Sequence, residues 1–203
     1  MTRIKFCGLT RLDDVQFATS MGVDAIGFVM TRRSKRFVEP AAAARLRDAV
    51  PPYITTVALV MDDEPAFIDE VLRVLRPDML QFHGDETDEA CAAYGVRYTK
   101  AIAMGEGAGA LDRLRRFPRA AGLLLDGHGL GEQGGSGQRF DWSLMPKDLA
   151  QPLILAGGLT ADNVAEAIRV AQPWAVDVSS GIESSPGIKD RAKMERFISA
   201  VRR

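Results

Sequence analysis

Cysteine and histidine are scarce in this 203-residue chain, which has two residues of each. Two cysteines are too few for the disulfide framework of a small secreted domain, and they fit a reduced, cytoplasmic environment. The cysteines Cys7 and Cys91 and the histidines His83 and His128 show none of the spacings of a structural zinc site. We therefore expect a cytoplasmic protein without a metal.

The chain also lacks long apolar runs and a net charge. No apolar run reaches about 18 residues, and the N-terminus leads into a predicted strand without the apolar segment of a signal peptide. We therefore expect no membrane association. Lys and Arg number 26 and Asp and Glu 27, so the net charge of −1 gives no overall field that would attract nucleic acid. Any anion must be bound by a local site.

Strand-like and helix-like segments alternate along the whole chain. Strands are predicted at 4–7, 24–29, 54–60, 79–82, 97–103 and 123–126, and two short apolar runs then end near 156 and 180. Helices are predicted at 11–21, 40–49, 64–75, 87–94, 108–117, 142–149, 161–171 and 189–201. Strand ends recur about every 25 residues, the size of one unit of a small (β/α)8 barrel. We predict a single α/β domain over 1–203, a (β/α)8 TIM barrel, in preference to a doubly wound open sheet.

Two apolar runs near the C-terminus end abruptly in glycine or serine. Gly157 and Gly158 follow the first run, Ser180 and Gly181 follow the second, and Thr160 is placed to cap the next predicted helix. Glycine lets the backbone turn tightly and brings bare N–H groups close to a ligand. A helix start after such a turn attracts anions. The two units predict a phosphate site between the last two strand–loop junctions, although ordinary αβ turns have the same pattern.

Reactive side chains in a barrel of this kind lie at the carboxyl ends of the strands. Cys7 ends the first strand and Asp126 the sixth, so the two side chains can face each other across the opening. Cys7 is either a buried small hydrophobe or a thiolate base or nucleophile. Asp126 is either a structural partner for backbone N–H groups or an acid or base. Together they suit an isomerisation that shuttles protons across a small ligand.

Three further side chains are candidates for binding. Arg36, in a basic loop after the second strand, is placed to hold a carboxylate in a bidentate pair. His83 either bonds a ligand or caps the helix that follows it. Asp177 alternates with its valine neighbours, so it faces the barrel interior if they face outward. There it either bonds ligand hydroxyls or pairs with another interior side chain. The glycine-rich segment 127–137 is interpreted as a mobile loop over the opening, because no helix start follows it to complete a dinucleotide fingerprint.

An ordered set of motifs resembles the phosphoribosylanthranilate isomerases of tryptophan biosynthesis. The motifs span nearly the whole chain: KFCGLT at 5–10, GFV at 27–29 with SKR at 34–36, QFHGDE at 81–86, LLD at 124–126, GGSG at 134–137 with FDW at 140–142, AGGL at 156–159 and DVSSGIE at 177–183. The resemblance implies a (β/α)8 barrel that catalyses an Amadori rearrangement without a cofactor or a metal. It also implies a small phosphorylated substrate. We expect a monomer or a homodimer.

The resemblance implies a role for each candidate residue. Cys7 would be the general base and Asp126 the general acid, while Arg36 would pair with the anthranilate carboxylate of the substrate. Asp177 would lie near the sugar hydroxyls, and His83 matches the pattern without a defined role. The phosphate would be held by the backbone N–H groups of Gly157, Gly158, Ser180 and Gly181. Two alternatives stay open, namely a non-catalytic phosphosugar-binding regulator and another phosphate-binding barrel enzyme of the same superfamily.

Overall fold

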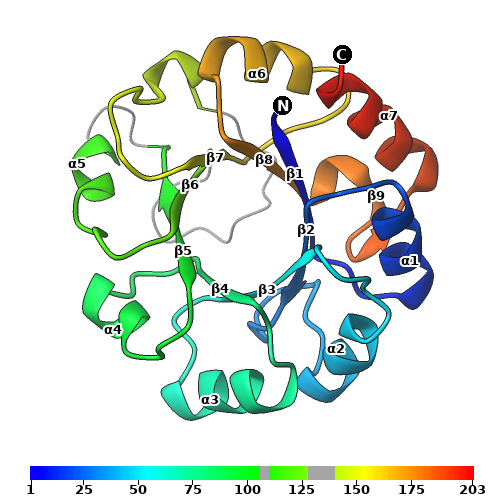
Figure 1. The fold of residues 1–203 in the computed structure, drawn as a ribbon, viewed down its shortest axis with the longest axis vertical. Helices are drawn as coiled ribbons and strands as arrows, with labels where there is room; N and C mark the ends of the chain where they lie inside the picture. The colour runs from blue at the N-terminus through cyan, green and yellow to red at the C-terminus, as the bar shows by residue number, and fades with distance from the viewer. Residues whose placement is uncertain (106–109, 128–139) are drawn as a thin grey trace.

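The computed structural model, which describes residues 1–105, 110–127 and 140–203, contains a closed barrel of eight parallel strands (Figure 1). The strands follow one another around the ring in chain order, and β1 pairs with both β2 and β8. The predicted fold class is therefore confirmed. The strands are β1 Arg3–Cys7, β2 Ala25–Val29, β3 Thr55–Val60, β4 Met79–Phe82, β5 Tyr98–Ala103, β6 Gly122–Asp126, β7 Leu153–Leu155 and β8 Ala175–Val178.

Helices surround this ring on the outside (Figure 1). They are α1 Leu12–Ser20, α2 Pro40–Arg47, α3 Pro65–Val74, α4 Asp88–Ala92, α5 Leu111–Leu114, α6 Val164–Ala171 and α7 Arg191–Val201. Proline occupies the first turn of α2 and of α3, where its fixed φ suits a helix start and its missing N–H is not needed. Helix α5, Leu111–Leu114, is shorter than the helix predicted over 108–117. Residues 108 and 109 lie outside the described residues.

Two of the predicted helices differ from the structure for local reasons. The helix expected over 142–149 is only the 3₁₀ turn η2, Trp142–Leu144. Pro146 disfavours a helical conformation at Met145, whose backbone is extended. The helix expected from 161 begins at Val164, and Thr160 does not cap it. Its N-cap residue is Asn163, whose Oδ1 accepts from the Thr160 N–H at 2.9 Å.

A small hairpin between β8 and α7 was not predicted. After the 3₁₀ turn η3, Ser180–Ile182, the chain forms the antiparallel pair β9 Glu183–Ser185 and β10 Ile188–Lys189. Helix α7 therefore begins at Arg191 rather than at 189, and the Asp190 side chain caps it by accepting from the Lys193 N–H at 2.9 Å. The hairpin brings Glu183 and Lys189 close together, and both are buried.

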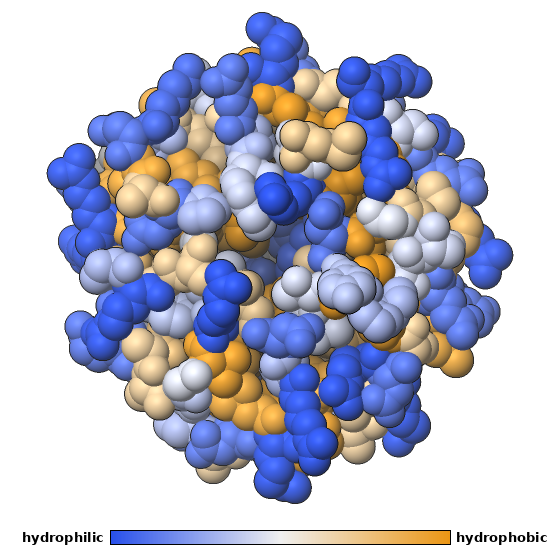
Figure 2. All heavy atoms as spheres, in the orientation of Figure 1, coloured by the Kyte–Doolittle hydropathy of each residue, from blue (hydrophilic) through white to orange (hydrophobic). Residues whose placement is uncertain are grey.

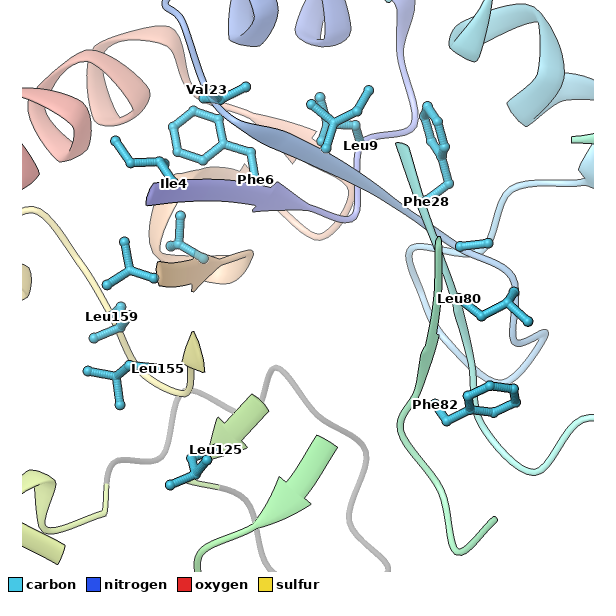
Figure 3. Packing of buried hydrophobic residues seen from close by; sticks show 14 of the residues in the cluster. Ile4, Phe6, Leu9, Val23, Phe28, Leu80, Phe82, Leu125, Leu155 and Leu159 are labelled. Atoms are coloured by element: carbon cyan, nitrogen blue, oxygen red, sulfur yellow. The ribbon is translucent and has the colours of Figure 1, made fainter. Parts of the chain in front are cut away.

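Alternate residues of each strand face two different environments. In β1, Ile4 and Phe6 belong to the apolar core between strands and helices, whereas Lys5 and Cys7 do not. Figure 3 shows Ile4 and Phe6 on the same side of β1, and Leu80 and Phe82 of β4 pointing away from the barrel interior. The interior holds a second, much smaller apolar cluster of Ala101, Leu124, Ile154, Ala156 and Ala175. This period of two decides which side chains are available to the opening.

The outer surface is mixed in character. In Figure 2, hydrophilic side chains lie over most of the visible face, with patches of apolar atoms between them. In the part of the chain that the structure describes, no helix has the length and apolar character to cross a membrane.

Candidate active site

All of the candidate residues line one cavity at the carboxyl ends of the strands. The cavity encloses about 730 Å³, part of it open to solvent. It is lined by Cys7, Arg36, His83, Asp126, Gly157, Gly158, Asp177, Ser180 and Gly181, together with residues such as Thr31, Ser34 and Gln81. The structure thus brings all nine sequence-predicted site residues to one cavity, and their functional roles stay predictions.

Cys7 reaches the cavity because its neighbour on β2 has no side chain. Cys7 is paired in register with Gly27, and a Cβ at Gly27 would lie 2.9 Å from Cys7 Sγ and 3.2 Å from Lys5 Nζ. Cys7 is only 5% exposed. Burial raises the pKa of the Cys7 thiol, and the positive charge of Lys5 offsets a part of this effect. Lys5, two residues earlier on the same face, donates to Asp177 Oδ2 at 2.9 Å.

Asp177 faces the barrel interior, as its alternation with Val176 and Val178 predicts. Of the two alternatives for this residue, pairing inside the barrel is confirmed by its ion pair with Lys5. Its other carboxylate oxygen, Oδ1, is buried and accepts no hydrogen bond from the described residues. Asp177 also lines the cavity, so its carboxylate lies beside the space that a ligand would occupy.

Asp126 and His83 lie together on the side of the cavity formed by β4 to β6. Asp126 is the last residue of β6 and is 5% exposed, and His83 Nε2 lies 3.7 Å from Asp126 Oδ2. The Nδ1 atom of His83 is 3.3 Å from Gln81 Nε2. Helix α4 is capped by Thr87, whose side chain accepts from the Ala90 N–H, so the alternative that His83 caps this helix is wrong.

A buried carboxylate orients Arg36. The Arg36 Nε and Nη2 atoms each donate to Glu183 at 2.8 Å, in a side-on bidentate pair. Gly8 makes room for this arrangement, because a Cβ there would lie 2.7 Å from Arg36 Cδ. A guanidinium has five N–H donors in a planar fork, so the edge that does not face Glu183 keeps donors for a ligand carboxylate.

Glu183 also binds Lys189, whose side chain has no exposed surface, at 2.9 Å. Burial by itself would raise the pKa of Glu183, but the hydrogen bonds from Arg36 and the charge of Lys189 outweigh it and lower that pKa. Lys189 Nζ donates in turn to the Ser179 carbonyl at 3.1 Å, directly before η3. This network connects the arginine to the turn after β8.

The two glycine turns after β7 and β8 touch each other. A Cβ at Gly181 would lie only 1.9 Å from the Leu159 carbonyl oxygen, so this contact requires glycine. Gly157 and Gly158 have φ of +84° and +61°. Within the described residues, the backbone N–H groups of Gly157, Gly158, Ser180 and Gly181 donate to no other group. The pattern suits an anion held by backbone N–H donors.

Asn163 holds the first of these turns in shape. Its Nδ2 donates to the Gly158 carbonyl at 2.8 Å while its Oδ1 accepts from Thr160. Sequence reasoning missed this residue, and it also missed Lys5, Gln81, Glu183 and Lys189. The period of two could have found Lys5 and Gln81, because they lie two residues before Cys7 and His83 on the same faces. Among the described residues there is no group of three or more His, Cys, Asp or Glu side chains that could hold a metal ion.

The arrangement combines a thiol, a carboxylic acid, an oriented arginine and a cradle of backbone donors around one cavity. Such a set can hold a ligand that carries a phosphate at one end and a carboxylate at the other. The thiol and the carboxylic acid can then transfer protons to and from the middle of that ligand.

Comparisons with known proteins agree with this geometry. Residues 4–200 match the model of a family described as N-(5'-phosphoribosyl)anthranilate isomerase. A relative of that name from Xanthomonas campestris pv. campestris is 48% identical, with 100% of this chain and 94% of the relative covered. The crystal structure of phosphoribosyl anthranilate isomerase from Thermotoga maritima is similar with a TM-score of 0.91 and 38% identity over 100% of this chain and 99% of that one.

A further solved phosphoribosyl anthranilate isomerase was crystallised in complex with reduced 1-(o-carboxyphenylamino)-1-deoxyribulose 5-phosphate. It has a TM-score of 0.89 and 35% identity to this chain, over 100% of this chain and 99% of that one.

Proposed function

The chain belongs to the N-(5'-phosphoribosyl)anthranilate isomerase family, and from this premise we propose which of its side chains carry out the isomerisation. The enzyme converts N-(5-phosphoribosyl)anthranilate to 1-(2-carboxyphenylamino)-1-deoxyribulose 5-phosphate in tryptophan biosynthesis. Among the functions that the sequence left open, the comparisons select this isomerase. The observation that carries the residue proposal is the convergence of Cys7, Asp126 and the glycine turns on one cavity.

Asp126 is the general acid for ring opening. It gives its proton to the furanose ring oxygen while the C1–O bond breaks and the anthranilate nitrogen supplies the electron pair for a C1=N bond. The product of this step is a protonated imine, and Asp126 becomes a carboxylate. His83, with Nε2 3.7 Å from Asp126 Oδ2, is placed to contact this carboxylate or the ligand.

Cys7 is the general base for the second step. As a thiolate it takes the proton from sugar C2, and the electrons of that C–H bond form a C1=C2 double bond while the imine nitrogen regains its lone pair. The enolamine then gives the ketone when C1 gains a proton and the C2 hydroxyl loses one. Each proton transfer by a positioned group contributes roughly 10²–10⁴ in rate.

The remaining residues bind the two ends of the substrate. The free edge of the Arg36 guanidinium pairs with the anthranilate carboxylate, and the N–H groups of Gly157, Gly158, Ser180 and Gly181 hold the phosphate. Asp177 Oδ1, which is buried and accepts no hydrogen bond from the described residues, accepts one from a sugar hydroxyl. Binding at both ends orients the reacting carbons between the acid and the base.

We also propose a cytoplasmic location. Cys7 and Cys91 are both free thiols, as expected for a reduced environment.

The proposal is tested by kinetics of two variants, followed by the fluorescence of the anthranilate group as freshly made substrate is consumed. Cys7→Ala and Asp126→Ala should each lower kcat by about 10² or more while a phosphate-bearing product analogue still binds. Cys91→Ala, at the other buried cysteine, and Asp13→Ala, at an exposed carboxylate on α1, are the matched controls and should keep parental kcat. Near-parental kcat in the Cys7 and Asp126 variants would overturn the assignment.

A further inference from the structure

Lys5 is a buried positive charge that the proposed mechanism does not use. It is 7% exposed and lies on the interior face of β1, two residues before Cys7. Its Nζ donates to Asp177 Oδ2 at 2.9 Å across the β1–β8 pairing, in which Lys5 is directly opposite Asp177. Burying an ammonium group is costly, so its position beneath the reacting thiol calls for a physical explanation.

Lys5 and Cys7 occupy the same small space above Gly27. A Cβ on Gly27 would lie 2.9 Å from Cys7 Sγ and 3.2 Å from both Cε and Nζ of Lys5. The ammonium group and the sulfur are therefore neighbours in the absence of a side chain at this position. Because the side chains of Lys5 and Cys7 are both buried, a charge on Lys5 acts on the sulfur with little screening by water.

Burial alone opposes the ionised form that a base at Cys7 needs. It raises the pKa of the thiol, and the charge of Lys5 is the largest influence that lowers it. The negative charge of Asp177 acts in the opposite sense, and Lys189 contributes a weaker favourable charge. Among the described residues, the charged or titratable groups that face this part of the cavity are Lys5 on β1, Arg36 after β2, His83 after β4, Asp126 on β6, Asp177 on β8 and Lys189 on β10.

We infer that Lys5 is a positioning residue that stabilises the thiolate of Cys7, and that Asp177 sets the strength of this effect by sharing the charge of Lys5. The inference rests on the proposed role of Cys7 as the base. This role explains why a lysine lies in the interior next to a carboxylate. The Lys5–Asp177 pair puts a positive charge, partly neutralised by Asp177, next to the sulfur of Cys7. Lys5 itself exchanges no proton with the substrate.

The test measures the pH at which half of Cys7 is ionised, from the ultraviolet absorbance of the thiolate and from the rate of alkylation by iodoacetamide. All proteins carry Cys91→Ala, so Cys7 is the single thiol. Lys5→Met removes the charge and keeps the length of the side chain. The midpoint should move to higher pH, and alkylation at neutral pH should slow by about tenfold, because a close buried unit charge is lost and the charge of Asp177 remains to oppose ionisation.

Asp177→Asn provides the second arm and should act in the opposite direction. It conserves volume and removes the carboxylate that competes for Lys5, so the midpoint should move to lower pH and alkylation at neutral pH should become several-fold faster. If the ion pair had only a structural role, its loss would shift the ionisation midpoint of Cys7 in the same direction in both variants. Lys5→Arg, which keeps the charge, should restore the parental midpoint if it folds.

Two results would overturn the inference: an unchanged midpoint in folded Lys5→Met, or a shift of both variants in the same direction. If Lys5→Met does not fold, Asp177→Asn alone decides, because a midpoint that fails to fall contradicts the inference. The outcome is independent of the proposed function, since titration of the thiol needs no turnover. An isomerase in which Cys7→Ala kept parental kcat would refute the base and leave the titration interpretable.

Discussion

The outer core and the interior of the barrel are built from the same strands and have opposite compositions. The outer core contains the large apolar side chains, among them Phe6, Phe28, Phe82 and Phe197. The interior contains the ion pair of Lys5 with Asp177, the thiol of Cys7 and only a small apolar cluster. Successive residues of a strand alternate between these environments. One residue therefore contributes to the stability of the core, while its neighbour is available for chemistry in the interior. The alternation lets the interior carry charged groups without weakening the core.

The largest loss of stability is expected for a substitution in the outer core, and it tests the difference between the two regions. Phe197 on α7 is fully buried and packs edge-to-face on Phe6, with ring centroids 6.0 Å apart and planes at 69°. Phe197→Ala should lower the free energy of unfolding by about 3–5 kcal/mol, measured by urea titration. Its kcat should stay near the parental value where the variant is folded. Leu12→Ala, at a side chain that is 45% exposed, should change stability by less than about 0.5 kcal/mol.

The cavity should show the opposite pattern. Arg36→Met should weaken binding of a carboxylate-bearing product analogue by about 1.5–3 kcal/mol, the value of a hydrogen bond to a charged group. Stability should fall by less than in Phe197→Ala, because Glu183 loses the two hydrogen bonds from Arg36 but keeps its buried ion pair with Lys189. Calorimetry gives the affinity, and urea titration gives the stability.

The matched control is Arg32→Met, because Arg32 lies in the same loop and pairs with Glu39 on the surface. It should leave the affinity unchanged. Equal losses of affinity in the two arginine variants would show that the loop acts through its overall charge rather than through one oriented guanidinium.

A smaller effect is expected for a buried carboxylate outside the cavity. Asp88 accepts from the Tyr98 hydroxyl and from Arg119 Nε at 2.8 Å. Burial would raise the pKa of Asp88, but these hydrogen bonds outweigh it and lower that pKa. Its contribution to stability is therefore present above the ordinary range of aspartate and is lost as the pH falls through the lowered pKa. Asp88→Asn should cost about 1.5 kcal/mol at neutral pH, a value at the low end because Arg119 is half exposed.

The pH series supplies the check on this prediction. The difference in unfolding free energy between parent and Asp88→Asn should shrink as the pH falls below the ordinary range of aspartate and through the lowered pKa of Asp88. A difference that stays constant with pH would mean that the carboxylate contributes by shape rather than by charge.

The period of two made most of the fold and the cavity predictable. Cys7, Asp126 and Asp177 end or interrupt apolar strands, and each lies where alternation puts it. Lys5 is harder to predict, because a lysine near a chain terminus is typical of a surface position and its partner Asp177 is identified only by the β1–β8 register.

The parts that were missed depend on short or distant interactions. The β9–β10 hairpin contains only 3 and 2 residues per strand, too few to show a periodic pattern, yet it supplies Glu183 and Lys189. The start of α6 depends on Asn163 bonding back to the glycine turn rather than on an N-cap at Thr160. The end of η2 depends on Pro146, because the residue before a proline disfavours the helical conformation.

The central claim is that adjacent residues of β1 have different roles: Phe6 stabilises the outer core, and Cys7 serves catalysis. The most direct test is to measure kcat and the free energy of unfolding of Phe6→Leu and Cys7→Ala. We expect Cys7→Ala to lose about 10² or more in kcat with stability changed by less than about 1 kcal/mol. We expect Phe6→Leu to lose about 1–3 kcal/mol of stability with kcat within about threefold of the parent. Comparable losses of kcat in both variants, or a Cys7→Ala protein that turns over normally, would contradict the account.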